Sequence, residues 1–130
     1  MNAQTTPDIE YLTSERMKGL PFSEAVRVGR MLYLSGQIGI DRSMKLVSGG
    51  ITAETRQAME NIKATLERYG SSLEHVIKAT VMLADMSEWE EMNKVYVTCF
   101  AKHLPARSAM GANGLAFGAR VEIECIAVLP

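Results

Sequence analysis

The sequence predicts an α+β fold in which two helices pack on one face of a mixed β-sheet. Residues 25–34, 76–83 and 106–128 alternate or run apolar in the manner of strands. Residues 52–69 and 87–103 carry apolar side chains at the three- and four-residue spacing of helices. The predicted order is therefore β-β-α-β-α-β-β, an α+β sandwich. We expect residues 1–20 to form a partly irregular N-terminal segment and residues 21–130 to form a single domain.

The first two strands are predicted to form a hairpin. Residues 25–28 and 31–34 flank Gly29 and Arg30. Glycine readily adopts the positive φ that the first central position of a type II′ turn requires. Residues 41–51 are rich in glycine and small polar side chains, so they are predicted to form a loop.

The first helix is expected to run from Thr52 to about Tyr69. Thr52 is suited to cap its N-terminus, and Glu54 lies in the first turn, where the helix dipole favours an acid. Gly70 is expected to end the helix. The apolar stripe that should face the sheet contains Met59, Ile62, Leu66 and Tyr69.

The second helix is predicted to begin with a capping box and to end before Pro105. In a capping box the serine and the glutamate three residues later satisfy each other's backbone donors, and Ser87 and Glu90 have this spacing. Pro105 interrupts the helical pattern. The predicted apolar stripe contains Trp89, Met92, Tyr96, Phe100 and His103.

The remaining strands include one with two apolar faces. In residues 76–83 one predicted face contains Ile77, Ala79, Val81 and Leu83, and the last two strands surround a loop at residues 111–118. The final strand is apolar at 121, 123, 125 and 127, and also at Ile126 and Val128 on its other face. Two helices cover only one face of the sheet, so we expect a second copy of the chain to cover the other.

Composition excludes several classes of function. The formal net charge is -1, with no cluster of basic residues, which argues against nucleic acid as a dedicated partner. No segment approaches the roughly 20 apolar residues of a membrane span, and no signal-peptide pattern is visible, so we expect a cytoplasmic protein. The two cysteines, Cys99 and Cys125, have neither metal-site spacing nor a disulfide framework.

Charged side chains near the C-terminus are candidates for a site that binds a small carboxylate. Arg107 follows Pro105 at the start of a strand, and its planar fork suits a carboxylate, although a surface ion pair is an equally good interpretation. Glu122 and Glu124 share one face of the last strand, where an acid is either solvated or functional. Ser35 and Gly36 follow a strand, either as a simple turn or as backbone that approaches a ligand.

These segments resemble the RidA (YjgF) family of reactive intermediate deaminases from about Phe22 to Val128. The resemblance rests on blocks in matching order: residues 33–38, 56–63, 78–81, 93–96, 105–108 and 120–128. It implies a chorismate-mutase-like fold and a homotrimer with ligand clefts between subunits. It also implies hydrolysis of 2-imino acids or enamines, such as 2-aminoacrylate, to 2-keto acids and ammonia, which protects the cell from reactive metabolites.

The resemblance assigns roles to individual residues. Arg107 matches the family's carboxylate-binding arginine, and Glu122 matches the glutamate that orients the attacking water. Ser35, Gly36 and Asn93 match residues of the cleft. Two positions depart from the deaminase pattern: Phe22 replaces a tyrosine, and Ala109 replaces a cysteine.

Three functions are compatible with the composition and with the resemblance to the RidA family. Imine hydrolysis is the first, and it needs no metal or cofactor because an imine carbon is already electrophilic. A non-catalytic trimer that binds small carboxylates is the second, favoured by Phe22 and Ala109. Endoribonuclease activity, from the family's older name, is the third, and the acidic isoelectric point of about 6.1 disfavours it.

Overall fold

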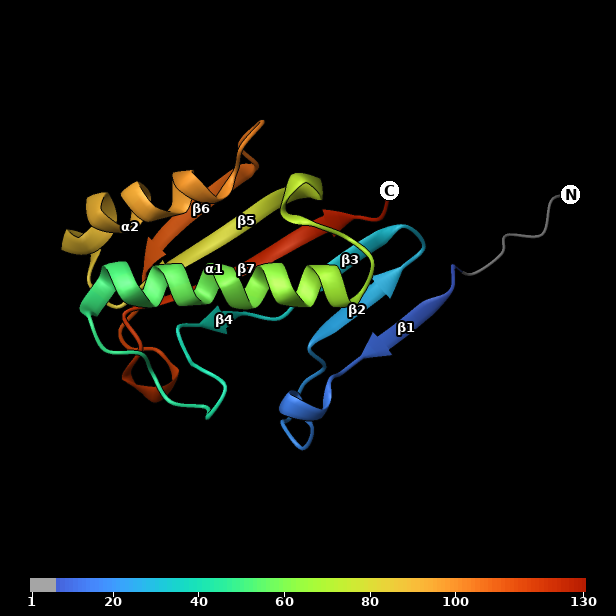
Figure 1. The fold of residues 1–130 in the computed structure, drawn as a ribbon, viewed down its shortest axis with the longest axis horizontal. Coiled ribbons are helices and arrows are strands. Elements are labelled where there is room, and N and C mark those ends of the chain that lie inside the picture. Colours follow the sequence, from blue (N-terminus) through green and yellow to red (C-terminus); the bar gives the residue numbers. More distant parts are fainter. Residues whose placement is uncertain (1–6) are drawn as a thin grey trace, which may run out of the picture.

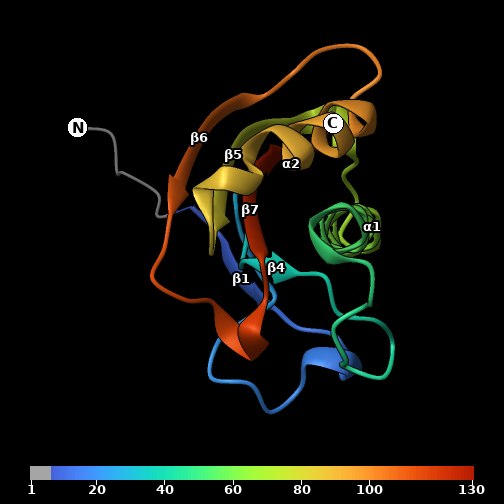
Figure 2. The same cartoon turned by 90° about the vertical axis from the view of Figure 1, so that its left-hand side faces the viewer.

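The computed structural model describes residues 7–130, which form one mixed sheet of seven strands with two helices on the same face (Figures 1 and 2). This confirms the predicted fold class. The elements are β1 (Ile9–Leu12), β2 (Ala25–Val28), β3 (Met31–Leu34), β4 (Gln37–Ile38), α1 (Gly50–Arg68), β5 (Val76–Leu83), α2 (Trp89–Tyr96), β6 (Ala106–Gly111) and β7 (Val121–Val128).

The sheet has the order β1-β2-β3-β7-β5-β6, and β4 pairs with β7 beside β3. Only β5 and β6 are parallel among these described strands. A parallel pair needs a long crossover, which α2 and its flanking turns supply. In this order β6 is an edge strand, and its outer side is open for pairing or contact.

The core lies between the sheet and the helices. Every second residue of β7 is buried on this side, from Val121 at 0% exposed to Cys125 at 2%. Ile62 and Leu66 of α1, both fully buried, pack in the same cluster. Burying one such aliphatic side chain contributes about 1.5–3 kcal/mol, so this layer holds α1 firmly on the sheet.

The predicted glycine turn of the hairpin and the predicted end of the first helix are confirmed, whereas both predicted helix N-caps are wrong. Gly29 in the hairpin and Gly70 after α1 both have positive φ, as their turns require. However, α1 begins two residues before Thr52, at Gly50, and Gly49 is its N-cap with a φ of 117°. A glycine at that left-handed position allows the turn without help from a side chain.

The second cap differs because a different side chain reaches the backbone. Asp85 accepts a hydrogen bond from the Ser87 amide at 2.9 Å and caps a 3₁₀ turn at Met86–Glu88. The α-helix then starts at Trp89 with no side-chain cap. Ser87 and Glu90 therefore do not form the predicted capping box.

The predicted alternation of β5 is wrong at its start. A β-bulge lies between Val76 and Lys78, so two residues occupy the place of one against β7. Val76 is consequently buried at 1%, whereas Ile77 is 46% exposed on the other face. From Ala79 onward the predicted alternation holds.

Part of the N-terminal segment joins the sheet. Residues 9–12 form β1, which pairs with β2, and residues 15–17 form a 3₁₀ turn, η1. The buried carboxylate of Glu24 accepts hydrogen bonds from Ser14 and Tyr69, both at 2.9 Å, and pairs with Arg68. These contacts fasten the segment to α1. Residues 1–6 of the predicted segment lie outside the described residues.

Among residues 7–130, no helix is both long enough and apolar enough to span a membrane.

Candidate functional site

Arg107 projects from the edge strand β6 toward the helices. It pairs in register with Ala79, whose side chain is buried under the helices. Its guanidinium carbon lies 4.8 Å from the ring centroid of Tyr96 and 5.8 Å from that of Trp89. One guanidinium nitrogen donates to Asn93 Oδ1 at 2.6 Å. Ring faces attract the cation and Asn93 fixes its orientation, so the remaining donors are held in place for an anion.

Helix α2 supplies all three partners of Arg107. Trp89, Asn93 and Tyr96 follow one another at spacings of four and three, which places them on one side of the helix. The helical spacing of apolar residues predicts that Trp89 and Tyr96 both lie in a stripe facing the core. Tyr96 is buried, but Trp89 is 40% exposed. The helical spacing of Trp89, Asn93 and Tyr96 was the sequence signal that could have identified these three partners of Arg107.

Glu122 lies on the opposite face of the sheet. It lines a pocket of about 180 Å³ together with Phe22, Gly36 and other mostly apolar residues. Burial raises the pKa of the Glu122 carboxyl, and the negative charge of Glu124 raises it further. The described residues contribute no hydrogen bond or ion pair to this carboxylate. Glu122 is therefore a partly desolvated acid whose pKa is raised toward neutral pH.

The chain around Gly36 is fixed against Glu122. The Ser35 hydroxyl donates to the Ser23 carbonyl at 2.6 Å, and the Ser35 amide donates to the Glu24 carbonyl at 3.0 Å. A Cβ added at Gly36 would lie 2.9 Å from Glu122 Cδ. Only a glycine permits this approach without displacing the carboxylate. Phe22, 46% exposed, forms another wall of the pocket.

Glu124 lies in different surroundings from Glu122, although both are on one face of β7. Glu124 is opposite Thr80 of β5 and lies beyond the residues of β7 that pair with β4. It lines a separate hollow with Tyr33 and Lys78. Its side chain is exposed. Glu124 contributes charge to its neighbour, whereas Glu122 alone reaches the apolar pocket.

The predicted site residues therefore form two groups within one chain. Arg107, Asn93 and the half-buried Ala109 lie at the β6 edge on the helix side of the sheet. Glu122, Gly36 and Phe22 lie on the open side. One copy of the chain does not bring the arginine and the glutamate together. They can act on one small molecule only if the β6 edge of one copy approaches the Glu122 pocket of another.

The two thiols are unsuited to act as nucleophiles. Cys125 is 2% exposed, and burial raises the pKa of its thiol to about 12. Burial also raises the pKa of Cys99. A protonated thiol is a poor nucleophile and a poor metal ligand. Among residues 7–130 no group of three or more histidine, cysteine or acidic side chains is placed to hold a metal ion.

Comparisons with known proteins agree with the fold. The family described as Endoribonuclease L-PSP matches residues 14–129. A Mus musculus protein named 2-iminobutanoate/2-iminopropanoate deaminase is 46% identical over 109 residues, which are 83% of this chain and 81% of that protein. The crystal structure of RidA from an Antarctic Psychrobacter bacterium is 36% identical, with a TM-score of 0.82 and coverage of 97% of this chain and 100% of that one. The crystal structure of E. coli TdcF with bound serine is 29% identical, with a TM-score of 0.84 and coverage of 93% and 99%.

Proposed function

The chain belongs to the RidA/YjgF family, which is also described as Endoribonuclease L-PSP, and we propose that it hydrolyses 2-imino acids and their enamine tautomers to 2-keto acids and ammonia. Its identity of 46% with a named 2-iminobutanoate/2-iminopropanoate deaminase supports an imine as the substrate. The serine bound to TdcF, at 29% identity, is likewise a small molecule with a carboxylate.

The observation that carries the proposal is the raised pKa of Glu122 in its mostly apolar pocket. A general base works best when its pKa lies near the operating pH. The Glu122 carboxyl is shifted in that direction by burial in a pocket of about 180 Å³, a volume suited to a small substrate. The described residues offer this carboxylate no cationic partner that would hold it as a structural ion pair.

The proposed reaction begins with the substrate carboxylate on Arg107. The guanidinium, oriented by Asn93, accepts the carboxylate through charge-assisted hydrogen bonds. Glu122 takes a proton from a water molecule as its oxygen bonds to the imine carbon, and the C=N π electrons move to nitrogen. The resulting carbinolamine anion receives this proton from Glu122 on nitrogen, which gives the neutral carbinolamine. Glu122 then takes the hydroxyl proton and passes it to nitrogen as the C–N bond breaks and the C=O bond forms, so that ammonia leaves and the keto acid remains. An enamine first becomes an imine by protonation at carbon.

The proposed site is formed between copies of the chain. Arg107 and Glu122 face opposite sides of one sheet, and β6 is an open edge. The open face also exposes large apolar side chains: Tyr33 at 43%, Ile77 at 46% and Met110 at 47%. An apolar face of this kind favours burial against another copy. A closed ring of three copies, as the family resemblance implies, would repeat one arginine–glutamate cleft at each junction.

A second candidate function is carboxylate binding without turnover. Phe22 lines the Glu122 pocket without a hydroxyl, and Ala109 stands beside Arg107 on β6 without a thiol. These two departures remove polar groups but leave the arginine and the glutamate. Endoribonuclease activity is less compatible with a protein of net charge -1, because RNA binding depends on contacts from basic residues to phosphate.

The decisive experiment measures ammonia and keto-acid release from an imine generated by a dehydratase in the same cuvette. The wild type should accelerate release. Glu122→Gln should reduce the rate by at least about a hundredfold, the usual contribution of a general base, and Arg107→Ala should reduce it through loss of the charge-assisted contact with the substrate carboxylate. Glu124→Gln is the matched control on the same face and should stay within about tenfold.

Titration with pyruvate tests the binding site that both candidate functions share. Glu122→Gln should bind pyruvate as wild type does under either function, and the rate of imine hydrolysis separates them: if the protein binds carboxylates without catalysis, no variant changes that rate. If Arg107→Ala binds pyruvate normally, the site lies elsewhere and both candidates are wrong.

A further inference from the structure

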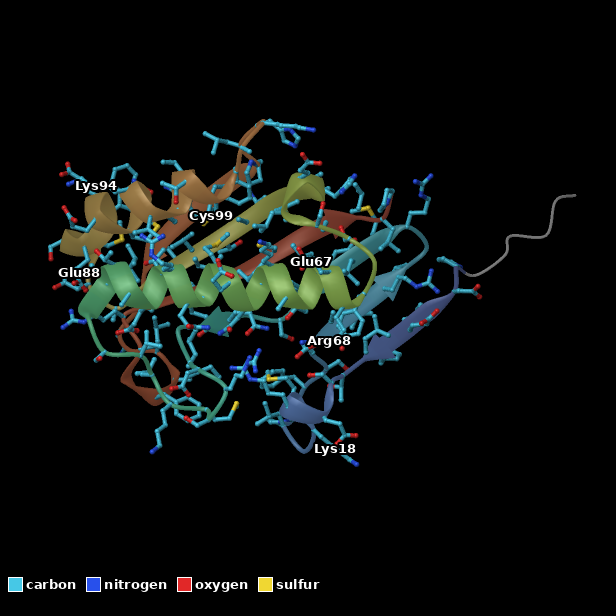
Figure 3. All side chains as sticks on the ribbon, viewed as in Figure 1. Lys18, Glu67, Arg68, Glu88, Lys94 and Cys99 are labelled. Atoms are coloured by element: carbon cyan, nitrogen blue, oxygen red, sulfur yellow. The ribbon has the colours of Figure 1, made fainter. Side chains whose placement is uncertain are left out.

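A second cleft lies on the α1 side of the molecule, away from the open face of the sheet. It has a volume of about 590 Å³ and is bordered by η1, the loop that precedes α1 and the C-terminal half of α1. In Figures 1 and 2, η1 and this loop lie side by side beneath α1. Figure 3 shows Arg68 in the region between α1 and η1. The volume is typical of a small-molecule site.

Three arginines from three separate segments line this cleft. Arg16 comes from η1, Arg42 from the loop, and Arg68 from the last turn of α1. Glu60 is the acidic residue of the lining. The cleft thus concentrates positive charge in a protein whose net charge is -1, and a local field of this kind attracts anions.

The walls of the cleft are held in place before any ligand binds. Arg16 donates to the Asp41 carbonyl at 2.7 Å and to the Ile40 carbonyl at 3.2 Å. The side-chain amide of Asn61 donates to the Ile38 and Ile40 carbonyls at 3.0 and 2.9 Å. These bonds tie η1 and α1 to the same stretch of chain, so the segments that carry Arg16 and Arg68 are held relative to each other.

Two acids near the cleft already have partners. The Asp41 carboxylate accepts hydrogen bonds from the amide and hydroxyl of Ser43 at 2.8 and 2.7 Å, within its own turn. The Glu24 carboxylate accepts from Tyr69 and Ser14 and pairs with Nη1 of Arg68, so Arg68 offers an anion its other donors. The Nε donor of Arg16 is buried and finds no acceptor among the described residues. An unmade hydrogen bond at a buried donor is unfavourable, which favours an added acceptor near Arg16.

We propose that this cleft binds a small molecule carrying a phosphate group. A carboxylate is satisfied by one guanidinium fork, whereas a tetrahedral phosphate presents oxygens in several directions and can accept from Arg16, Arg42 and Arg68 together. The site is distinct from the imine site. Met44 is shared between the lining of this cleft and that of the Glu122 pocket, whereas no arginine of the cleft lines that pocket.

The test is calorimetric titration of the whole protein with inorganic phosphate and with glycerol 3-phosphate, in a phosphate-free buffer at constant ionic strength. Acetate serves as the carboxylate comparison. Arg42→Gln is the main variant, because Arg42 is exposed and its loss should not disturb folding. Lys63→Gln is the matched control, since it removes the same charge from an exposed position of α1 outside the cleft.

Saturable binding of a phosphate compound that weakens by about tenfold in Arg42→Gln, with Lys63→Gln unchanged, would support the proposal; that factor corresponds to about 1.4 kcal/mol. Tighter binding of glycerol 3-phosphate than of phosphate identifies a phosphate ester as the ligand, and equal binding identifies free phosphate. No saturable binding, equal weakening in both variants, or equal affinity for acetate would each overturn it.

Discussion

Gly36 lies directly against the carboxylate of Glu122, so closely that a Cβ at Gly36 would overlap Oε2 and lie 2.9 Å from Cδ. The pairing of β4 with β7, in which Ile38 is opposite Glu122, brings the two together. The backbone at Gly36 is therefore one wall of the Glu122 pocket. Gly36 does not have a positive φ, so the requirement for glycine at this position is one of space and not of conformation.

Gly36→Ala should lower the rate of imine hydrolysis by at least about tenfold, because the methyl group displaces the Glu122 carboxylate from the substrate. Folding should be preserved, which thermal melting checks. The same substitution in a Glu122→Gln background should cause little further loss, since residues that act through one another are not additive. A full additional loss in the double variant would show that Gly36 does not act through Glu122.

Glu122→Gln should stabilise the folded protein at neutral pH. The raised pKa means that the folded state holds this proton more tightly than the unfolded state, so wild-type stability falls as pH rises from the ordinary glutamate pKa through the raised one. Glutamine does not titrate and avoids this loss. Urea midpoints at about pH 4 should agree for the two proteins, and those at about pH 8 should favour the variant. A wild type as stable as the variant at the higher pH would contradict the raised pKa.

Glu124→Gln should move the acid limb of the pH–rate profile to lower pH. The negative charge of Glu124 helps to raise the pKa of Glu122, so its removal lets Glu122 become a carboxylate at lower pH. Rates near neutral pH should remain within about tenfold of wild type. The measurement is imine hydrolysis across the pH range, and an acid limb shifted upward would be inconsistent with this coupling.

Asn93→Ala should raise KM more than it lowers kcat. Its side-chain oxygen accepts from the Arg107 guanidinium at 2.6 Å, so its loss leaves the arginine charged but less well oriented for the substrate carboxylate. We expect a rise in KM of about three- to tenfold, in keeping with about 1 kcal/mol for one hydrogen bond. Lys94→Ala is the control, since Lys94 is exposed on the same helix and pairs with Glu91. An unchanged KM in Asn93→Ala would mean that Asn93 does not orient Arg107 for the substrate carboxylate.

Mixing two inactive variants should restore activity if the site lies between copies. In a hybrid of Arg107→Ala and Glu122→Gln chains, some junctions combine the intact arginine of one copy with the intact glutamate of the next. Random assembly into a ring gives about a quarter of the wild-type sites. The assay follows imine hydrolysis after the mixed chains are unfolded and refolded together. Recovery of no activity would place both residues of each site in one copy.

The alternation and spacing of apolar residues were sufficient to predict α1, the hairpin and the long strands, because these patterns follow from the period of each element. The second helix was predicted to continue almost to Pro105, but α2 ends at Tyr96 and a 3₁₀ turn follows at Val97–Cys99. Charged side chains near the C-terminus made Arg107, Glu122 and Glu124 candidates, and the family resemblance chose Glu122 and added Asn93. Local errors arose where several arrangements were compatible with the sequence. A glycine turn begins α1 in place of Thr52, and a 3₁₀ turn capped by Asp85 precedes α2 in place of a Ser87 cap. A bulge reverses the faces of Val76 and Ile77.

Only the tertiary structure decided which residues share a site. The two-residue strand β4 is too short for a sequence pattern, yet its pairing with β7 places Gly36 against Glu122. The raised pKa of Glu122 likewise depends on burial, which strand alternation alone does not determine. The sequence placed an arginine and a glutamate on two strands. The register of β5, β6 and β7 put them on opposite faces of the sheet, because side chains alternate sides at each residue and the strand pairing sets which side each one takes.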